Sequence, residues 1–217
     1  MRVVIAGGHG TIALILERLL ADSGHEPVAL IRNPDHMSDV EAAGATPVLL
    51  DLETASVDDV ARVLQEADAA VFAAGAGPGS TAERKFTVDR DAAILLADAA
   101  EKAGVGRLIV ISAIATDRFD AASDDIFQLY LRAKSEADAA VRSRDLDWTI
   151  VRPGSLTNDA GTGRVRAASE IPGGGRIARA DVAATIVALL TSGAASRTQF
   201  ELVSGDDPID SALEHLA

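Results

Sequence analysis

The sequence of 217 residues contains no cysteine, which excludes disulfide frameworks, thiolate zinc sites and thiol nucleophiles together. Its four histidines are scattered without the spacing of metal ligands, so we expect no metal site. Aromatic residues make up only 3%, with one Tyr and one Trp, so stacking platforms for single-stranded nucleic acid or sugar rings are poorly supplied. The few aromatic residues are therefore informative.

Basic residues are also scarce. Lys and Arg total 20 against 33 Asp and Glu, a formal net charge of −13 that repels a phosphate backbone and argues against a nucleic-acid partner. The longest apolar stretch, residues 183–190, is interrupted by Thr185 and is well short of the roughly 18 residues that a membrane-spanning helix needs. The first residues run directly into glycines and leave no room for a signal peptide. We therefore expect a soluble, cytoplasmic protein without a membrane partner.

Short β-branched runs alternate with longer Ala- and Leu-rich segments of helical period, which is typical of parallel βαβ units. Strands are predicted at 2–6, 27–31, 46–50, 69–74, 107–112, 147–151 and 198–203. Helices are predicted at 11–23, 35–43, 57–66, 83–103, a segment ending near 144, and 179–190. Most strands are wholly apolar, as expected when helices cover both faces of a sheet. The pattern predicts an α/β fold, a doubly wound parallel sheet in one domain over residues 1–217.

Glycines mark the ends of several predicted elements. Gly24, Gly44 and Gly104 each stand where a left-handed residue would end a helix. The glycine-dense stretch 161–175 lies inside a segment, 155–178, that we expect to form a mobile flap over the substrate. Arg179 is a candidate brace for this flap and Asp181 a candidate cap of the last core helix.

The first predicted strand runs into a glycine-rich turn and then a helix. Gly7, Gly10 and Ala13 give the spacing G-x-x-G-x-x-A, in which Gly7 permits the tight turn and Gly10 a close approach of a pyrophosphate. Amides near His9, Thr11 and Ile12 would then point at the anion. Tight turns also need glycine without a ligand, but the position at the first strand-to-helix junction favours dinucleotide binding.

The end of the second strand bears on which dinucleotide binds. An NAD site places an acidic residue about 20 residues beyond the glycines, whereas here the strand ends in Arg32 and Asn33. A guanidinium at this position favours the 2′-phosphate of NADP, although a solvated loop arginine is the alternative. Asp51, after the third strand, is expected beside the adenine ring or, alternatively, as a loop or cap carboxylate.

The single tyrosine, Tyr130, precedes one of only three lysines, Lys134, by four residues, so both would point from one helix face. An ammonium group near a phenol lowers the pKa of the phenol and prepares it to protonate a carbonyl oxygen. Ser112, at the end of the fifth strand, is a candidate donor to the same oxygen. The alternative is a tyrosine that only packs and a plain strand-end serine.

These residues together resemble the short-chain dehydrogenase/reductase superfamily, and more narrowly its atypical, compact NAD(P)H-binding branch related to NmrA-type regulators and biliverdin/flavin reductases. The resemblance covers nearly the whole chain and implies a Rossmann fold. It implies catalytic roles for Ser112, Tyr130 and Lys134. It also implies cofactor contacts by Gly7, Gly8, His9, Gly10, Thr11, Ile12, Arg32, Asn33, Asp51, Leu52, Ala73, Ala74, Gly75, Lys134, Pro153 and Gly154. An Asp-rich loop, 117–125, lengthens the interval between Ser112 and Tyr130 to 18 residues.

Three functions are compatible with this sequence. The first is an NADPH-dependent oxidoreductase acting on a small carbonyl, quinone or flavin-like acceptor. The second is a non-catalytic NADP(H)-binding regulator that senses redox state. The third, a nucleotide-sugar epimerase or dehydratase, is disfavoured because only about 65 residues follow the sixth strand. The sequence leaves the oligomeric state and the identity of the substrate open.

Overall fold

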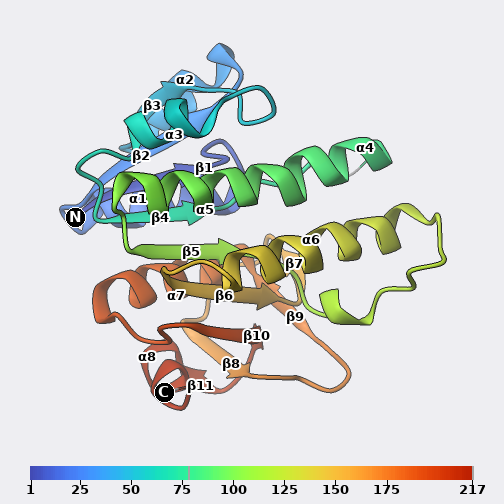
Figure 1. Cartoon of the computed structure of the whole chain (residues 1–217). Coiled ribbons are helices and arrows are strands. Elements are labelled where there is room, and N and C mark those ends of the chain that lie inside the picture. Colours follow the sequence, from blue (N-terminus) through green and yellow to red (C-terminus); the bar gives the residue numbers. More distant parts are fainter. Residues whose placement is uncertain (78, 217) are drawn as a thin grey trace.

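The computed structural model describes residues 1–77 and 79–216 and contains a nine-stranded sheet in the order β11-β8-β10-β6-β5-β4-β1-β2-β3. Figure 1 shows the strands side by side in this spatial order, from β3 at the top to β11 at the bottom. Seven strands run parallel: β1 (Arg2–Ala6), β2 (Glu26–Ile31), β3 (Thr46–Leu49), β4 (Ala69–Phe72), β5 (Arg107–Ile111), β6 (Asp147–Pro153) and β10 (Thr198–Ser204). The doubly wound parallel sheet predicted from the sequence is confirmed.

Helices cover both faces of the sheet. α1 (Thr11–Asp22) and α7 (Arg179–Ser192) pack together on one face. The other face carries α3 (Val57–Val63), α5 (Ala92–Ala103) and α6 (Ile126–Arg142). The remaining helices are shorter: α2 (Met37–Ala42), α4 (Ala82–Arg84), α8 (Ile209–Glu214) and the 3-10 turns Pro34–His36 and Thr116–Arg118. Within the described ranges, no helix combines the length and the apolar character required to cross a bilayer.

Strand β1 illustrates why most strands have continuous apolar sequences. Val3 and Ile5 belong to the core cluster beneath α1 and α7, whereas Val4 and Ala6 belong to the cluster on the opposite face. Because successive side chains of a strand point to opposite faces, a strand with helices on both sides has no polar position. All four residues are fully buried.

The predicted helix 83–103 contains a local change of pitch. α4 and α5 are joined by a π-helical segment, Lys85–Asp91, and Figure 1 draws the three as one continuous helix. In this segment Thr87 contacts Glu53, and Asp89 pairs with Lys134. Such π segments frequently lie at functional sites. The predicted helix-ending glycines are confirmed as left-handed residues, with φ of 76° at Gly24, 84° at Gly44 and 75° at Gly104.

The segment 155–178 contains three short strands that the sequence pattern did not reveal. β7 (Ser155–Thr157) and β9 (Arg176–Ala178) form a separate pair, while β8 (Arg164–Ala168) joins the main sheet antiparallel to β10. β11 (Asp207–Pro208) extends the sheet beyond β8. The segment is tied to α7: the amides of Thr162 and Gly163 donate to Asp181, and Arg179 donates to Asn158 at 2.8 Å. Asp181 therefore anchors this segment instead of capping α7.

Candidate cofactor site

A cavity of about 270 Å³ opens at the carboxyl ends of β1 to β4, beside the point where the strand order reverses around β1. In open α/β sheets this is where ligands bind. Its walls combine the glycine loop, the ends of β2, β3 and β4, and one face of the helix containing the π segment. The lining residues are Gly7, His9, Gly10, Leu30, Ile31, Arg32, His36, Leu50, Asp51, Leu52, Glu53, Ala73, Ala74, Gly75, Ala76, Arg84, Val88 and Ala92.

The three glycines of the first loop, Gly7, Gly8 and Gly10, are required for different structural reasons. Gly7 has a φ of 85°, and a Cβ atom there would lie 2.6 Å from the Cα of Ala74. A Cβ atom at Gly8 would lie 2.4 Å from the Cβ of Ala29. Gly10 has an ordinary φ of −65°, and its nearest neighbour would be the Gly7 carbonyl oxygen at 3.3 Å. The fold itself therefore requires Gly7 and Gly8, whereas Gly10 keeps the cavity wall free of a side chain.

The amino end of α1 lies at this wall. Gly10 is the N-cap residue and has no side chain, so no side-chain bond caps the first amides of the helix, including those of Thr11 and Ile12. Amides without a side-chain cap and the positive end of the helix dipole together suit an anion. The neighbouring His9 ring stacks on His36, with ring centroids 3.5 Å apart, and its Nε2 lies 2.8 Å from Asp39.

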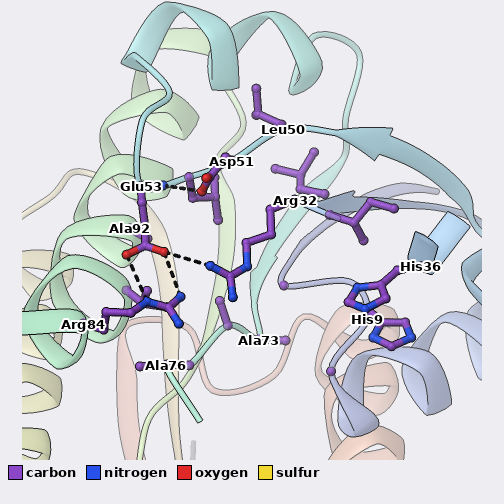
Figure 2. A pocket seen from close by; sticks show the side chains of 18 residues that line it. His9, Arg32, His36, Leu50, Asp51, Glu53, Ala73, Ala76, Arg84 and Ala92 are labelled. Atoms are coloured by element: carbon purple, nitrogen blue, oxygen red, sulfur yellow. Dashed lines mark hydrogen bonds and ion pairs between the residues drawn. The ribbon is translucent and has the colours of Figure 1, made fainter. Parts of the chain in front are cut away.

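Two arginines and one carboxylate meet inside the cavity. Figure 2 shows the Glu53 carboxylate between the guanidinium groups of Arg32 and Arg84. Arg32 Nη1 lies 3.2 Å from Glu53 Oε2, and Arg84 Nη2 lies 2.8 Å from the same oxygen. The hydrogen bond from Arg84 is the main reason that the pKa of Glu53 is lowered. An acid thus lies beside Arg32 at the tip of β2, and it comes from the loop after β3.

The other predicted residues of this half behave as loop residues that line or support the cavity. Asp51 lines it and accepts a hydrogen bond from the Glu53 amide at 3.0 Å, and Leu52 lies beside it. Asn33 accepts from the Asp35 amide and caps the turn after β2. Asp51 is therefore a loop carboxylate, as one of its two predicted roles requires, and its place in the cavity lining leaves the adenine contact as a prediction.

Tyr130 and Lys134 both lie on α6, as their spacing predicted. Lys134 is buried, pairs with Asp89 at 3.4 Å and donates to the carbonyl oxygen of Ile111 at 3.3 Å. Tyr130 is half-buried, with Lys85 Nζ 5.4 Å from its ring centroid. Burial raises the pKa of Tyr130, and the charges of Asp89 and Asp138 raise it further. The sequence predicted a phenol pKa lowered by Lys134; the pKa is raised instead, chiefly because burial disfavours the charged form.

Ser112 belongs to a buried polar network. Its hydroxyl donates to Asp138 Oδ2 at 2.8 Å, and Arg152 donates to the same oxygen at 2.8 and 2.9 Å. Arg152 also binds Asp117 at 2.5 and 3.0 Å, which explains how the Asp-rich loop 117–125 is attached to β6. This attachment lowers the pKa of Asp117.

Pro153 and Gly154 lie at the end of β6. The Gly154 amide donates to the Leu202 carbonyl at 2.9 Å, and a Cβ atom at Gly154 would lie 2.4 Å from the Gly175 carbonyl oxygen. The loop before β9 therefore approaches the backbone here. Among the described residues, the cavity lining includes neither this pair nor Ser112, Tyr130 and Lys134.

The cavity thus brings together Gly7, His9, Gly10, Arg32, Asp51, Leu52 and Ala73 to Gly75 from the predicted set. The lining residues that were not among the predicted site residues are Leu30, Ile31, His36, Leu50, Glu53, Ala76, Arg84, Val88 and Ala92. Glu53 had a weak signal, because it stands two residues after Asp51 at the end of a predicted strand. Val88 belongs to the Val88-Asp89 pair that shares in the family resemblance, whereas Arg84 had no signal, since its approach to the cavity depends on how the helix packs over β4.

The profile of a family described as NAD(P)H-binding matches residues 7–193. This chain belongs to that family. It is 36% identical over 217 residues, with full coverage of both chains, to a Bacillus subtilis protein named as uncharacterized sugar epimerase YhfK. A structure from Bacillus halodurans, provisionally named an NAD-dependent epimerase/dehydratase, is 34% identical with a TM-score of 0.91 and complete coverage of both chains. The oxidoreductase ylbE of Lactococcus lactis is 28% identical with a TM-score of 0.87, covering 100% of this chain and 96% of that one.

Membership of the NAD(P)H-binding family confirms the resemblance to atypical short-chain dehydrogenase/reductases. The cavity fits a dinucleotide: Gly10 leaves room for a phosphate at the uncapped end of α1, and Arg32 adds a cation at the far wall. Leu50, Ala73 and Ala92 add apolar surface to the wall of the cavity.

Proposed function

We propose that this protein is an NADPH-dependent reductase of a small carbonyl, quinone or flavin-like acceptor. The observation that carries the proposal is the placement of Gly10, the uncapped start of α1 and Arg32 around one cavity at the switch point of the sheet. This arrangement offers separate positions for a diphosphate and a 2′-phosphate. The family membership and the name oxidoreductase of one relative support it.

Each predicted residue has a part in this proposal. The amides of Thr11 and Ile12 bind the diphosphate, helped by the Gly8–His9 turn, and Arg32 with Asn33 holds the 2′-phosphate. Asp51 and Leu52 border the adenine, and Ala73 to Gly75 line the middle of the site. Lys134, with Pro153 and Gly154, serves the nicotinamide end. NADPH supplies a hydride when bound.

Tyr130 and Ser112 are proposed to complete the reaction. Tyr130 Oη would donate its proton to the acceptor oxygen as the hydride arrives, against the burial and the neighbouring carboxylates that make this phenol a weaker acid. Ser112 must turn its hydroxyl away from Asp138 to contact the acceptor. Lys134 is positioned to hold a ribose only if it exchanges one of its present partners, Asp89 or the carbonyl oxygens of Ala74 and Ile111.

The same observations favour the non-catalytic regulator as the second candidate. The Ser112 hydroxyl is already bonded to Asp138, and the pKa of Tyr130 is raised instead of lowered. A site with these features binds a dinucleotide without needing to transfer a proton. The two candidates therefore differ in turnover and agree on binding.

The experiment measures NADPH oxidation by the purified chain against aldehydes, quinones and free flavins, after cofactor binding has been established by titration. For a carbonyl acceptor, Tyr130→Phe should lower turnover about 10²- to 10⁴-fold while cofactor affinity stays within about twofold. Lys134→Ala should weaken both, whereas Lys102→Ala, a lysine paired with Asp58 on the surface, should change neither. Binding of NADPH without oxidation against any acceptor class would favour the regulator.

Two further outcomes are informative. Unchanged turnover in the Tyr130→Phe variant, with an acceptor that is reduced well, would mean that the proton comes from water or from a flavin-like acceptor itself. Conversion of a nucleotide sugar without net NADPH consumption would replace the reductase by the epimerase suggested by the names of two relatives.

A further inference from the structure

Glu53 stands in the part of the cavity where the proposed function places a 2′-phosphate. It follows Asp51 on the loop after β3, and its carboxylate points into the cavity between Arg32 and Arg84 (Figure 2). Arg32 is the residue to which the sequence assigned the phosphate. A carboxylate 3.2 Å from that guanidinium competes with any anion that the guanidinium binds.

The contacts of Glu53 are unequal on its two sides. Arg84 reaches both carboxylate oxygens, with Nη2 2.8 Å from Oε2 and Nε 3.4 Å from Oε1, and Thr87 donates to Oε1 at 2.7 Å. Arg32 makes one contact of 3.2 Å, and its side chain is 55% exposed against 32% for Arg84. A single exposed ion pair is weak, whereas a forked pair with a further hydrogen bond is held more firmly. Arg32 can therefore leave Glu53 easily, and Arg84 keeps it in place.

The charge of Glu53 persists at neutral pH. The hydrogen bond from Arg84 lowers the pKa of its carboxyl below the ordinary value, with a further contribution from Thr87. A phosphate on Arg32 would bring nearly two negative charges within about one ion-pair distance of this carboxylate. Uncompensated, that repulsion would oppose NADPH and leave NADH unaffected.

Resting on the proposed NADPH function, we propose that Glu53 and Arg84 together set the cofactor selectivity of this site. Glu53 opposes the 2′-phosphate, and Arg84, held in a fork against Glu53, neutralises that opposition. Arg84 is in this view a positioning residue that acts through Glu53. Arg32 remains the residue that touches the phosphate.

The test uses ligand fragments that differ only in the phosphate, 2′,5′-ADP and 5′-AMP, titrated calorimetrically into the full chain. Glu53→Gln should tighten 2′,5′-ADP about 5- to 10-fold and leave 5′-AMP within about twofold, because the amide keeps the shape and loses the charge. Arg84→Gln should weaken 2′,5′-ADP about 10-fold. In the double variant, Glu53→Gln should restore 2′,5′-ADP affinity to within about threefold of the parent chain.

Glu136→Gln is the matched control. Glu136 also bridges two arginines, Arg90 at 2.9 Å and Arg132 at 2.8 Å, but it is not among the residues that line the cavity. Removal of the Glu136 charge should leave the affinities for 2′,5′-ADP and 5′-AMP unchanged. Circular dichroism and the melting temperature of each variant establish that it is folded.

Three results would overturn the inference. Glu53→Gln weakening 5′-AMP and 2′,5′-ADP alike would make Glu53 a ribose ligand. An Arg84→Gln defect that Glu53→Gln does not rescue would make Arg84 a direct phosphate ligand. Failure of both parent and Glu53→Gln chains to bind 2′,5′-ADP would refute the inference together with the NADPH preference. The expected affinities with no reduction of any acceptor would refute the reductase alone.

Discussion

Replacing Glu17 with Gln should remove one component of the pH dependence of stability. Glu17 lies on α1 behind the glycine loop and is fully buried, and its Oε1 is 3.1 Å from the position that a Cβ atom of Gly8 would take. Neither carboxylate oxygen has a hydrogen-bond partner among the described residues. Burial without a partner raises its pKa from 4.5 to about 8, since the charged form loses its hydration.

The sign and size of the effect follow from proton linkage. Below pH 4.5 the carboxyl is protonated in both the folded and the unfolded chain, so its contribution to stability is fully present. Between pH 4.5 and about 8 the unfolded chain releases this proton and the folded chain keeps it. Because of this group, the free energy of unfolding falls by about 1.4 kcal/mol per pH unit in this range. The total decrease is about 5 kcal/mol between pH 4.5 and about pH 8.

Urea unfolding between pH 5 and pH 8 measures the effect, with the fluorescence of the buried single tryptophan, Trp148, as the probe. The free energy of unfolding of the Glu17→Gln chain should rise steadily relative to that of the parent as the pH increases. The difference should grow by several kcal/mol up to pH 8, with an unchanged m-value. Glu41→Gln, on the exposed surface of α2, should not alter the parent's pH profile. A constant difference between Glu17→Gln and parent across this range would refute the burial argument.

The remaining predictions concern the cofactor site. Arg32→Ala should erase most of the preference for NADPH over NADH, a loss of about 1.5–3 kcal/mol in NADPH binding. The control Arg62→Ala breaks an exposed ion pair of the same 3.2 Å length and should change neither affinity. Equal affinities of the parent chain for NADPH and NADH would contradict this prediction. Gly10→Val should abolish NADPH binding in a folded chain, because its backbone is ordinary and only the cavity is filled. Full NADPH affinity in the Gly10→Val chain would show that the loop is only a turn. Gly8→Val should instead lower the melting temperature, because Ala29 leaves no room for even a Cβ atom at this position.

The sequence by itself determined the architecture. Most parallel strands are consecutive apolar runs, the helices have their own period, and Gly24, Gly44 and Gly104 end three of them, so the information lies within short segments. Gly7 and the Tyr130–Lys134 pair were predictable for the same reason, because a turn and a helix face are local geometries. The strand β8 was not, because Arg164 and Arg166 interrupt its apolar pattern and its pairing with distant β10 forms it.

The tertiary structure alone decided the electrostatics of the site. Lys134 is close to Tyr130 in the sequence, but burial of Tyr130 and the charges of Asp89 and Asp138 raise the pKa of the phenol. Asp89 comes from the π segment and also pairs with Lys134. Ser112 lies where it was predicted, yet Asp138 from α6 takes its hydrogen bond. Glu53 and Arg84 meet across 31 residues of sequence. Charge interactions depend on distance and burial in space, which a sequence does not state. For that reason the pKa values and partners of the predicted residues, and the meeting of Glu53 with Arg84, were not predictable from the sequence.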